Sequence, residues 1–304
     1  MFENFVQHRL RKLSFNWRCR GILDTPPIRL RPAPIRIVSM VRSRDLIMYL
    51  LAIKSFYCHL PGGEIVVMDD GTLTARDREV LRRHLGGPRI MRVDSVETGT
   101  CPEGGCWERL LHILDLSRDS YVIQLDSDML ATGPVPEVVA AIQENRAFTL
   151  NSGPDYRIVD LEAAAAEAAR SKDDHVQVLS ERALPRLPPG MGRLYVHGSA
   201  GFAGFARGGP GREVAEAFSL AMQAALGQRW AEWSSEQVAS NYLVCNSPGG
   251  MVLPWPKYCC FYPDVVPDEA VMLHFIGTHR FNDGVYLRKA RRVVAELADR
   301  RVTA

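Results

Sequence analysis

The sequence predicts an α/β fold in which a mostly parallel central sheet carries helices on both faces. Short apolar segments rich in β-branched residues alternate with longer amphipathic segments between residues 35 and 150. Proline, glycine or acidic residues bound these segments, which is typical of strands and helices joined by short loops. Strands that alternate with helices favour a parallel sheet built by right-handed crossovers. The chain of 304 residues, 46% of them hydrophobic, is long enough for a full core.

The first four elements follow from local patterns. Segment 35–41, IRIVSMV, is rich in β-branched residues and follows a proline-broken stretch, so it is the first predicted strand. Segment 45–60 has helical length and periodicity, and Pro61-Gly62-Gly63 ends it. Strand 64–71 is short and apolar and ends in two acids and a glycine. The amphipathic helix 74–86 closes on Gly86.

The same alternation continues along the first half of the chain. The further predicted elements are strand 89–95, helix 106–118, strand 121–126, helix 134–145 and strand 147–150. No G-x-G-x-x-G follows the first strand, and no G-x-x-x-x-G-K-[ST] occurs anywhere in the sequence. A dinucleotide-binding fold and a P-loop enzyme therefore both lack their sequence signature.

The second half is less regular. The predicted elements there are helices 161–174, 211–230 and 234–244, a glycine-rich segment with aromatic residues at 194–209, an apolar strand at 271–281 and a surface helix at 287–301. Ser234 and Gln237 fit a capping box at the start of the third of these helices.

The elements divide the chain into three parts. The predicted division is a basic N-terminal extension 1–33, a domain 34–285 with halves 34–150 and 151–285, and a C-terminal surface helix 286–304.

Charge is unevenly distributed. Residues 1–44 contain ten Lys or Arg against two acids, so this segment carries +8 and the rest of the chain −6 of the total of +2. We expect no nucleic-acid partner, and the basic segment is a candidate for peripheral contact with an anionic membrane, or else a solvated tail packed on the domain. No apolar run is long enough for a membrane span. The odd number of seven cysteines favours a reducing, cytoplasmic location, with an Arg-rich transit peptide as the alternative.

Two carboxylates follow the predicted strand 121–126. Asp126 and Asp128, in YVIQLDSDML, lie at the carboxyl end of a strand, where open α/β sheets bind their ligands. Side chains two residues apart in extended chain point the same way, and two carboxylates together are unfavourable unless a cation lies between them. Mg²⁺ or Mn²⁺ suits such a site. The alternative is that Asp126 caps a turn and Asp128 is solvated.

A second acidic strand end and a late histidine segment extend this pattern. Asp69-Asp70-Gly71 follows the second predicted strand, and HFIGT, starting at His274, ends the predicted strand 271–281. In this order, D-D-G, D-x-D and H-F-x-G-T over residues 35–285 resemble the nucleotide-sugar-dependent glycosyltransferases of the GT-A fold, which have a Rossmann-like sheet. The late segment resembles the family-8-like pattern in part, with Arg280 near the place of its Lys-Pro.

The resemblance implies a metal and diphosphate site. Asp126 and Asp128 would bind Mn²⁺ or Mg²⁺ together with the diphosphate of the donor, and His274 would be the third protein ligand of the metal. Gly277 and Arg280 would lie in the loop that holds the diphosphate. The alternatives are a hydrogen-bonded core histidine and a surface arginine.

It also implies a nucleotide site near the first two strands. Met40, Val41 and Arg42 end the first strand and are expected to line the nucleotide pocket. Asp69 and Asp70 would accept hydrogen bonds from the base or ribose, or else close an Asx turn in which Gly71 supplies the unusual backbone angle.

The remaining expected site residues come from helices and the glycine-rich segment. Arg109 would contact the nucleotide sugar from helix 106–118, or else be a solvated charge. Glu236 and Gln237 are expected catalytic residues beside Asp128: an acid here would take the proton from the acceptor hydroxyl, or the pair would contact the donor sugar. In segment 197–208, Phe202 could stack on a sugar, or the segment could be a buried strand. His197 is a pocket-lining candidate.

These expectations define a function. The leading hypothesis is a metal-dependent glycosyltransferase of hexosyltransferase type that transfers a sugar from a nucleoside diphosphate sugar, expected to be a UDP-sugar, to a hydroxyl of a saccharide, lipid or protein acceptor. The motifs do not distinguish inversion from retention. One alternative is a non-catalytic relative that binds nucleotide sugars. A second is a sugar-1-phosphate nucleotidyltransferase, although SMVRSRD after the first strand lacks the glycines that this class needs.

Overall fold

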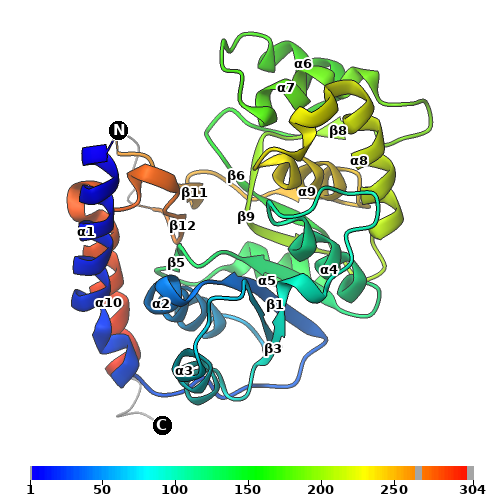
Figure 1. Ribbon diagram of the computed structural model, residues 1–304. Helices are drawn as coiled ribbons and strands as arrows, with labels where there is room; N and C mark the ends of the chain where they lie inside the picture. Colours follow the sequence, from blue (N-terminus) through cyan, green and yellow to red (C-terminus); the bar gives the residue numbers. More distant parts are fainter. Residues whose placement is uncertain (1, 264–268, 300–304) are drawn as a thin grey trace.

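A seven-stranded sheet forms the centre of the computed structural model, which describes residues 2–263 and 269–299 (Figure 1). The strand order is β10-β6-β9-β4-β1-β2-β3. The bounds are β1 (Ile35–Val41), β2 (Glu64–Asp69), β3 (Arg89–Arg92), β4 (Tyr121–Leu125), β6 (Phe148–Asn151), β9 (Gly198–Phe205) and β10 (Met251–Val252). All neighbouring pairs are parallel except those of β9, which runs antiparallel to β4 and to β6. The mostly parallel sheet is thus confirmed.

Helices cover both faces of this sheet, as predicted. Ile37 of β1 packs in one core cluster with α2, whereas its neighbour Val38 packs in a second cluster with α4. The alternation follows because successive side chains of a strand point to opposite faces. The bounds of the helices are α2 (Leu46–Tyr57), α3 (Ala75–Leu85), α4 (Trp107–Ser117), α5 (Pro136–Gln143), α6 (Leu161–Ala168), α7 (Val176–Ala183), α8 (Arg212–Leu226) and α9 (Ser235–Cys245).

A three-stranded sheet lies beside the central one. It consists of β5 (Met129–Ala131), β12 (Met272–His274) and β11 (Tyr258–Cys260), with β12 in the middle. β12 runs antiparallel to β5, and their register places His274 opposite Met129. A third pair, β7 (Val159–Asp160) with β8 (Leu194–Tyr195), lies near α6.

The basic N-terminal segment packs on the domain. It begins with α1 (Phe2–Arg18), which lies beside the C-terminal helix α10 (Val285–Asp299) (Figure 1). The Phe15 ring packs 4.3 Å from that of Tyr286 and 5.4 Å from that of Phe281. Phe15 therefore belongs to the main core. No helix in the described ranges combines the length and the apolar character needed to cross a membrane.

Several boundaries differ from the sequence prediction. Strand 89–95 ends at Arg92 and continues as a short 3₁₀ turn. Helix 161–174 is only α6, and a separate helix, α7, follows it. The strand predicted at 271–281 shortens to β12, because the chain turns after His274. Residues 264–268 and 300–304, which include the end of the predicted tail helix, lie outside the described residues.

The capping box at the start of α9 is wrong. Ser234 has a left-handed backbone with φ of 85° and makes no side-chain capping bond. The Gln237 side chain is used elsewhere, because its Oε1 accepts a bond from the Ala200 amide at 3.2 Å and its Nε2 donates to Gln177 at 2.9 Å. Gln237 thus faces strand β9 rather than its own helix terminus.

Candidate active site

The Asp126-Ser127-Asp128 segment joins β4 to β5, and main-chain bonds hold it from two sides. The Asp126 amide donates to the Gly201 carbonyl at 2.8 Å, which ties the segment to β9. The Phe275 amide donates to the Asp128 carbonyl at 3.0 Å, which ties it to the chain after β12. Because β12 also pairs with β5, the register brings His274 next to Asp128.

Asp126, Asp128 and His274 form a compact group of potential metal ligands. One ligand atom from each residue lies within 4.8 Å of the other two. His274 Nε2 is 3.2 Å from Asp128 Oδ1 and 3.9 Å from Asp126 Oδ2. Two carboxylates and an imidazole are a donor set that suits Mn²⁺, and Mg²⁺ through the oxygens. The chemistry and spacing of these side chains therefore fit the divalent metal expected from the sequence.

Two residues of β9 support the imidazole of His274. Ser199 Oγ is 3.0 Å from Nδ1, so Nε2 is the nitrogen directed at the carboxylates. Gly201 lies directly against the ring, and a Cβ at this position would come within 2.6 Å of Nδ1. Contacts of this kind fix the orientation of a histidine ligand.

Two arginines neutralise the carboxylates. Arg109 of α4 pairs with Asp126, and its second nitrogen is 3.4 Å from Glu236 Oε1. Only 5% of Arg109 is exposed, so it is not the solvated helix charge that the sequence allowed as an alternative. Arg280 pairs with Asp128 and donates from Nε to the Phe275 carbonyl at 2.8 Å. Arg280 is thus tied to the same turn that carries His274.

Burial and these charges shift the pKa values of the site. Burial lowers the pKa of His274, but the charge and hydrogen bond of Asp128 outweigh it and raise the pKa to about 10. Burial acts to raise the pKa of Asp128, yet His274 and Arg280 hold it below its usual range. Burial raises the pKa of Glu236 to about 7, with the charge of Arg109 opposing and that of Asp126 adding. Without metal, His274 and Arg280 are therefore the two groups whose positive charge balances Asp128.

A cavity of about 430 Å³ opens over this group. It brings together nine of the residues expected from the sequence. Its lining includes Arg109, Asp126, Asp128, His197, Glu236, Gln237, His274, Gly277 and Arg280.

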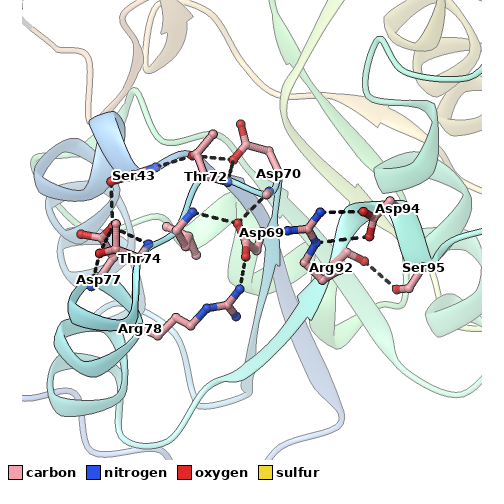
Figure 2. Close-up of polar contacts among 12 residues, drawn as sticks. Ser43, Asp69, Asp70, Thr72, Thr74, Asp77, Arg78, Arg92, Asp94 and Ser95 are labelled. Atoms are coloured by element: carbon pink, nitrogen blue, oxygen red, sulfur yellow. Dashed lines mark hydrogen bonds and ion pairs between the residues drawn. The ribbon is translucent and has the colours of Figure 1, made fainter.

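The residues expected at a nucleotide site lie outside this lining. Asp69 is fully buried at the end of β2 (Figure 2). Its Oδ1 accepts bonds from the amides of Gly71 at 2.8 Å and Leu73 at 3.1 Å, and its Oδ2 pairs with Arg78. The expectation that Asp69 faces a nucleotide is therefore corrected, because its carboxylate closes the turn. Gly71 supplies the positive φ of 100°, as the Asx-turn alternative required.

Asp70 points the other way from the same turn and remains half-buried (Figure 2). Its Oδ1 accepts bonds from the Thr72 amide at 3.0 Å and hydroxyl at 2.7 Å. Its Oδ2 is 3.2 Å from Arg42 Nε. Asp70 and the exposed Arg42 thus form a polar pair at the ends of β2 and β1, which is the place the sequence assigned to the nucleotide.

Two other expected contacts are corrected by burial. Val41 is fully buried in the core, so its side chain cannot line a pocket, and Met40 beside it is half-buried. Phe202 is also fully buried and packs against Phe56 and Phe148 rather than facing a sugar. The glycine-rich segment therefore contains the buried strand β9, in which Gly201 allows the close approach of His274.

Several cavity residues were not found from the sequence. Ser199 and Gly201 contact the imidazole of His274. These contacts arise because segments that are remote in the sequence come together in the fold. Trp233 lines the cavity although it is highly exposed. The only sequence signal for the two β9 residues was the density of glycine in 197–208.

Comparison with known proteins identifies the fold. No protein-family profile and no curated protein sequence matches this chain. Among solved structures, the chain is similar to an active-site variant of LgtC in which glutamine is replaced by glutamate, with a TM-score of 0.51, 13% identity, and coverage of 86% of this chain and 95% of LgtC. The galactosyltransferase LgtC in complex with donor and acceptor sugar analogs gives a TM-score of 0.47, 15% identity, and coverage of 86% and 95%.

A further similar structure is the glycosyltransferase GlyE of Streptococcus pneumoniae TIGR4. Its TM-score is 0.49 at 15% identity, and the match covers 88% of this chain and 64% of GlyE. The similarity to the LgtC variant shows that the protein has the GT-A fold, with a group of potential metal ligands at the carboxyl end of β4.

Proposed function

We propose that the protein is a metal-dependent glycosyltransferase that transfers a sugar, of hexose type, from a UDP-sugar to an acceptor hydroxyl. The observation that carries the proposal is the group of Asp126, Asp128 and His274, which opens into a cavity at the carboxyl end of a parallel strand in a GT-A fold. Ligands of open α/β sheets bind at this edge. A D-x-D sequence of the family-8-like kind at this place supports the same assignment.

The side chains divide the work between metal and donor. Asp126, Asp128 and His274 would hold Mn²⁺ or Mg²⁺, which when bound supplies positive charge to the diphosphate leaving group. Arg280 lies beside Asp128, and its guanidinium would also donate a charge-assisted hydrogen bond to the phosphates. The amide of Gly277 would donate to them as well. Arg109 pairs with Asp126 and Glu236 and would hold both carboxylates in place.

Glu236 and Gln237 would serve the transferred sugar and the attacking hydroxyl. Glu236 lines the cavity, and its raised pKa is suited to accepting a proton near neutral pH. Gln237 lines the cavity beside it, bonded to Ala200 and Gln177. The LgtC variant also carries its substitution at an active-site glutamine.

The nucleotide would extend from this cavity toward the ends of β1 and β2. Arg42 and Asp70 present a cation and a carboxylate there, and the main chain at Met40 and Val41 runs beside them. These groups suit the hydrogen-bonding edges of a base and a ribose.

The experiment that tests the proposal is donor turnover. The protein is incubated with UDP-glucose, UDP-galactose or UDP-N-acetylglucosamine, and released UDP is measured with Mn²⁺ and with EDTA. We expect release from at least one donor, lost in EDTA and in Asp128→Asn. Binding of UDP and Mn²⁺ without release from any donor, over a broad panel of acceptors, would instead favour the non-catalytic relative. Release of UTP from a UDP-sugar and pyrophosphate would favour the nucleotidyltransferase.

We also propose that α1 contacts an anionic membrane, where a lipid-linked acceptor could be presented. Leu10, Leu13 and Trp17 are 60%, 59% and 64% exposed and follow an i, i+3, i+7 spacing, so they form one apolar face. Phe15 on the opposite side packs into the core. An apolar face flanked by arginines is the pattern of a helix that lies in a membrane interface. The exposed arginines that flank this face are Arg9, Arg18 and Arg20.

Point variants test this contact better than removal of the extension, because Phe15 and Ile22 belong to the core. We expect the protein to sediment with vesicles of phosphatidylcholine and phosphatidylglycerol and less with phosphatidylcholine alone. Leu10→Glu with Leu13→Glu should abolish sedimentation, whereas Leu220→Glu, at an exposed leucine of α8, should not. Equal sedimentation of all variants would contradict the proposal.

A further inference from the structure

A second polar cluster lies at the cavity wall and shares no residue with the metal-ligand group. Its centre is Glu181 of α7, which is only 5% exposed. Glu181 Oε1 is 2.7 Å from His197 Nδ1 and accepts a bond from the Tyr195 hydroxyl at 3.0 Å. Gln177 Nε2 is 3.3 Å from the same oxygen. A buried carboxylate with this many donors is held in one position.

This carboxylate sets the tautomer of His197. Because a carboxylate accepts and cannot donate, its 2.7 Å contact places a proton on His197 Nδ1, and in the neutral imidazole the lone pair is then on Nε2. The ring of Tyr156 stacks on the imidazole at 4.6 Å, which fixes the ring plane. No partner for Nε2 is found among the described residues, and His197 lines the cavity. Nε2 is thus an oriented hydrogen-bond acceptor that the chain leaves for a ligand.

The turn before β9 places this acceptor in the cavity of the metal ligands. Ser199 of β9 contacts His274, and His197 lies two residues earlier, in a tight turn in which the Gly198 amide donates to the Val196 carbonyl at 3.0 Å. Gly198 between them faces the opposite side, where a Cβ would meet Asn241 and Thr149 at 2.9 Å. His197 and His274 both line the same cavity.

An exposed tryptophan completes this end of the cavity. Trp233, just before α9, lines the cavity and is 71% exposed. A large aromatic face left open beside polar groups is the usual composition of a small-molecule pocket. The C–H face of a sugar ring can pack on an indole ring. A sugar hydroxyl can donate a hydrogen bond to a lone pair such as that of His197 Nε2.

We propose that His197, positioned by Glu181, and Trp233 form the acceptor subsite, and that the acceptor is a saccharide. The acceptor ring lies on Trp233, and one of its hydroxyls donates a hydrogen bond to His197 Nε2. The proposal rests on the proposed glycosyltransferase function and adds the chemical class of its acceptor. Glu181 is a positioning residue, since it acts through the tautomer of His197.

The test compares acceptors and variants with the donor that gives UDP release. The acceptors are lactose, maltose and cellobiose, against N-acetyltyrosinamide and octanol. We expect transfer to at least one disaccharide, and Trp233→Ala should raise the KM of that acceptor about tenfold with unchanged UDP affinity. Leu220→Ala, at an exposed leucine of α8 that is outside the cavity lining, is the control and should leave the KM unchanged.

A second readout concerns Glu181. Glu181→Leu removes the acceptor at His197 Nδ1 and should move the His197 proton toward Nε2, seen in the ¹⁵N spectrum of histidine-labelled protein, and should raise the acceptor KM. An unchanged tautomer would overturn the positioning role. Transfer only to the tyrosine derivative or octanol, or an unchanged acceptor KM in Trp233→Ala, would overturn the subsite even where donor hydrolysis is intact. If the unaltered protein neither binds UDP nor hydrolyses any donor, the proposed function is contradicted, and the subsite with it.

Discussion

Gly201 lies against the imidazole of His274, and this contact joins the central sheet to the metal-ligand group. A Cβ at Gly201 would come within 2.6 Å of His274 Nδ1, while the Gly201 carbonyl accepts the Asp126 amide at 2.8 Å. One residue of β9 therefore sets both the position of the first aspartate and the space for the histidine.

Substitution of this glycine should disturb the metal ligands and leave the rest of the fold. Gly201→Ala forces the His274 ring away, because real Cβ atoms do not approach other atoms so closely. Outer contacts of metal-bound histidines typically change metal affinity 10- to 100-fold when altered. We expect Mn²⁺ affinity, measured by titration calorimetry, to fall by at least tenfold.

Gly133→Ala is the control for this substitution. Its Cβ would lie 3.5 Å from Val271 Cγ1, an ordinary contact, so Mn²⁺ affinity should not change. Equal Mn²⁺ affinity in Gly201→Ala and the unaltered protein would show that the His274 position does not matter for metal.

Arg109 should contribute strongly to stability. It is buried between Asp126 and Glu236, and removing one partner of a buried ion pair leaves an uncompensated charge. We expect Arg109→Met to lower the free energy of unfolding by about 3–5 kcal/mol at pH 8, measured by urea denaturation. Arg118→Met, at an exposed arginine after the same helix, should change it by less than about 0.5 kcal/mol. A loss below 1 kcal/mol in Arg109→Met would contradict the buried bridge.

Glu236 should make the metal-free protein less stable as pH rises. Its carboxyl keeps its proton to about pH 7 in the folded state, whereas an unfolded glutamate loses it near pH 4.5. The stability from the protonated form is therefore present below pH 4.5 and is lost as pH rises through 7. Glu236→Gln cannot ionise, so its stability relative to the unaltered protein should increase between pH 5 and pH 8, by up to about 3 kcal/mol. A constant difference in urea midpoints would show that Glu236 titrates normally.

His84, which is not part of the cavity lining, should make the protein less stable as pH decreases. Burial and the charge of Lys54, 3.3 Å away, lower the pKa of His84 to about 4. The unfolded chain binds this proton near pH 6.5, so stability should fall as pH decreases from 6.5 to 4. In His84→Gln this loss, roughly 2–3 kcal/mol, should be absent. If both proteins lose the same stability between pH 7 and pH 5, the imidazole is not held neutral.

The sheet and the aspartate pair were predictable because their signals are local. An apolar strand, an acidic turn and an amphipathic helix each lie within a short segment, and YVIQLDSD shows a strand and its ligands together. The same holds for the Asx turn at Asp69, where the carboxylate, the amides and Gly71 are neighbours in the chain.

Contacts between remote segments were not predictable in this way. The sequence does not show that β12 pairs with β5, that Arg109 is buried between two acids or that Glu181 lies behind His197. The error at Ser234 has the same origin, because Gln237 bonds to β9 and α7 instead of capping its own helix.

The most direct test of the central claim is a calorimetric titration of UDP into the protein, first with Mn²⁺ and then with EDTA. We predict binding with Mn²⁺ that is lost in EDTA and in Asp128→Asn, and kept in Asp119→Asn at an exposed aspartate just before β4. Binding of UDP that is equal in EDTA, or unchanged in Asp128→Asn, would contradict the assignment of Asp126, Asp128 and His274 as the metal and diphosphate site. Absence of binding by both UDP and GDP in every condition would contradict the donor site altogether.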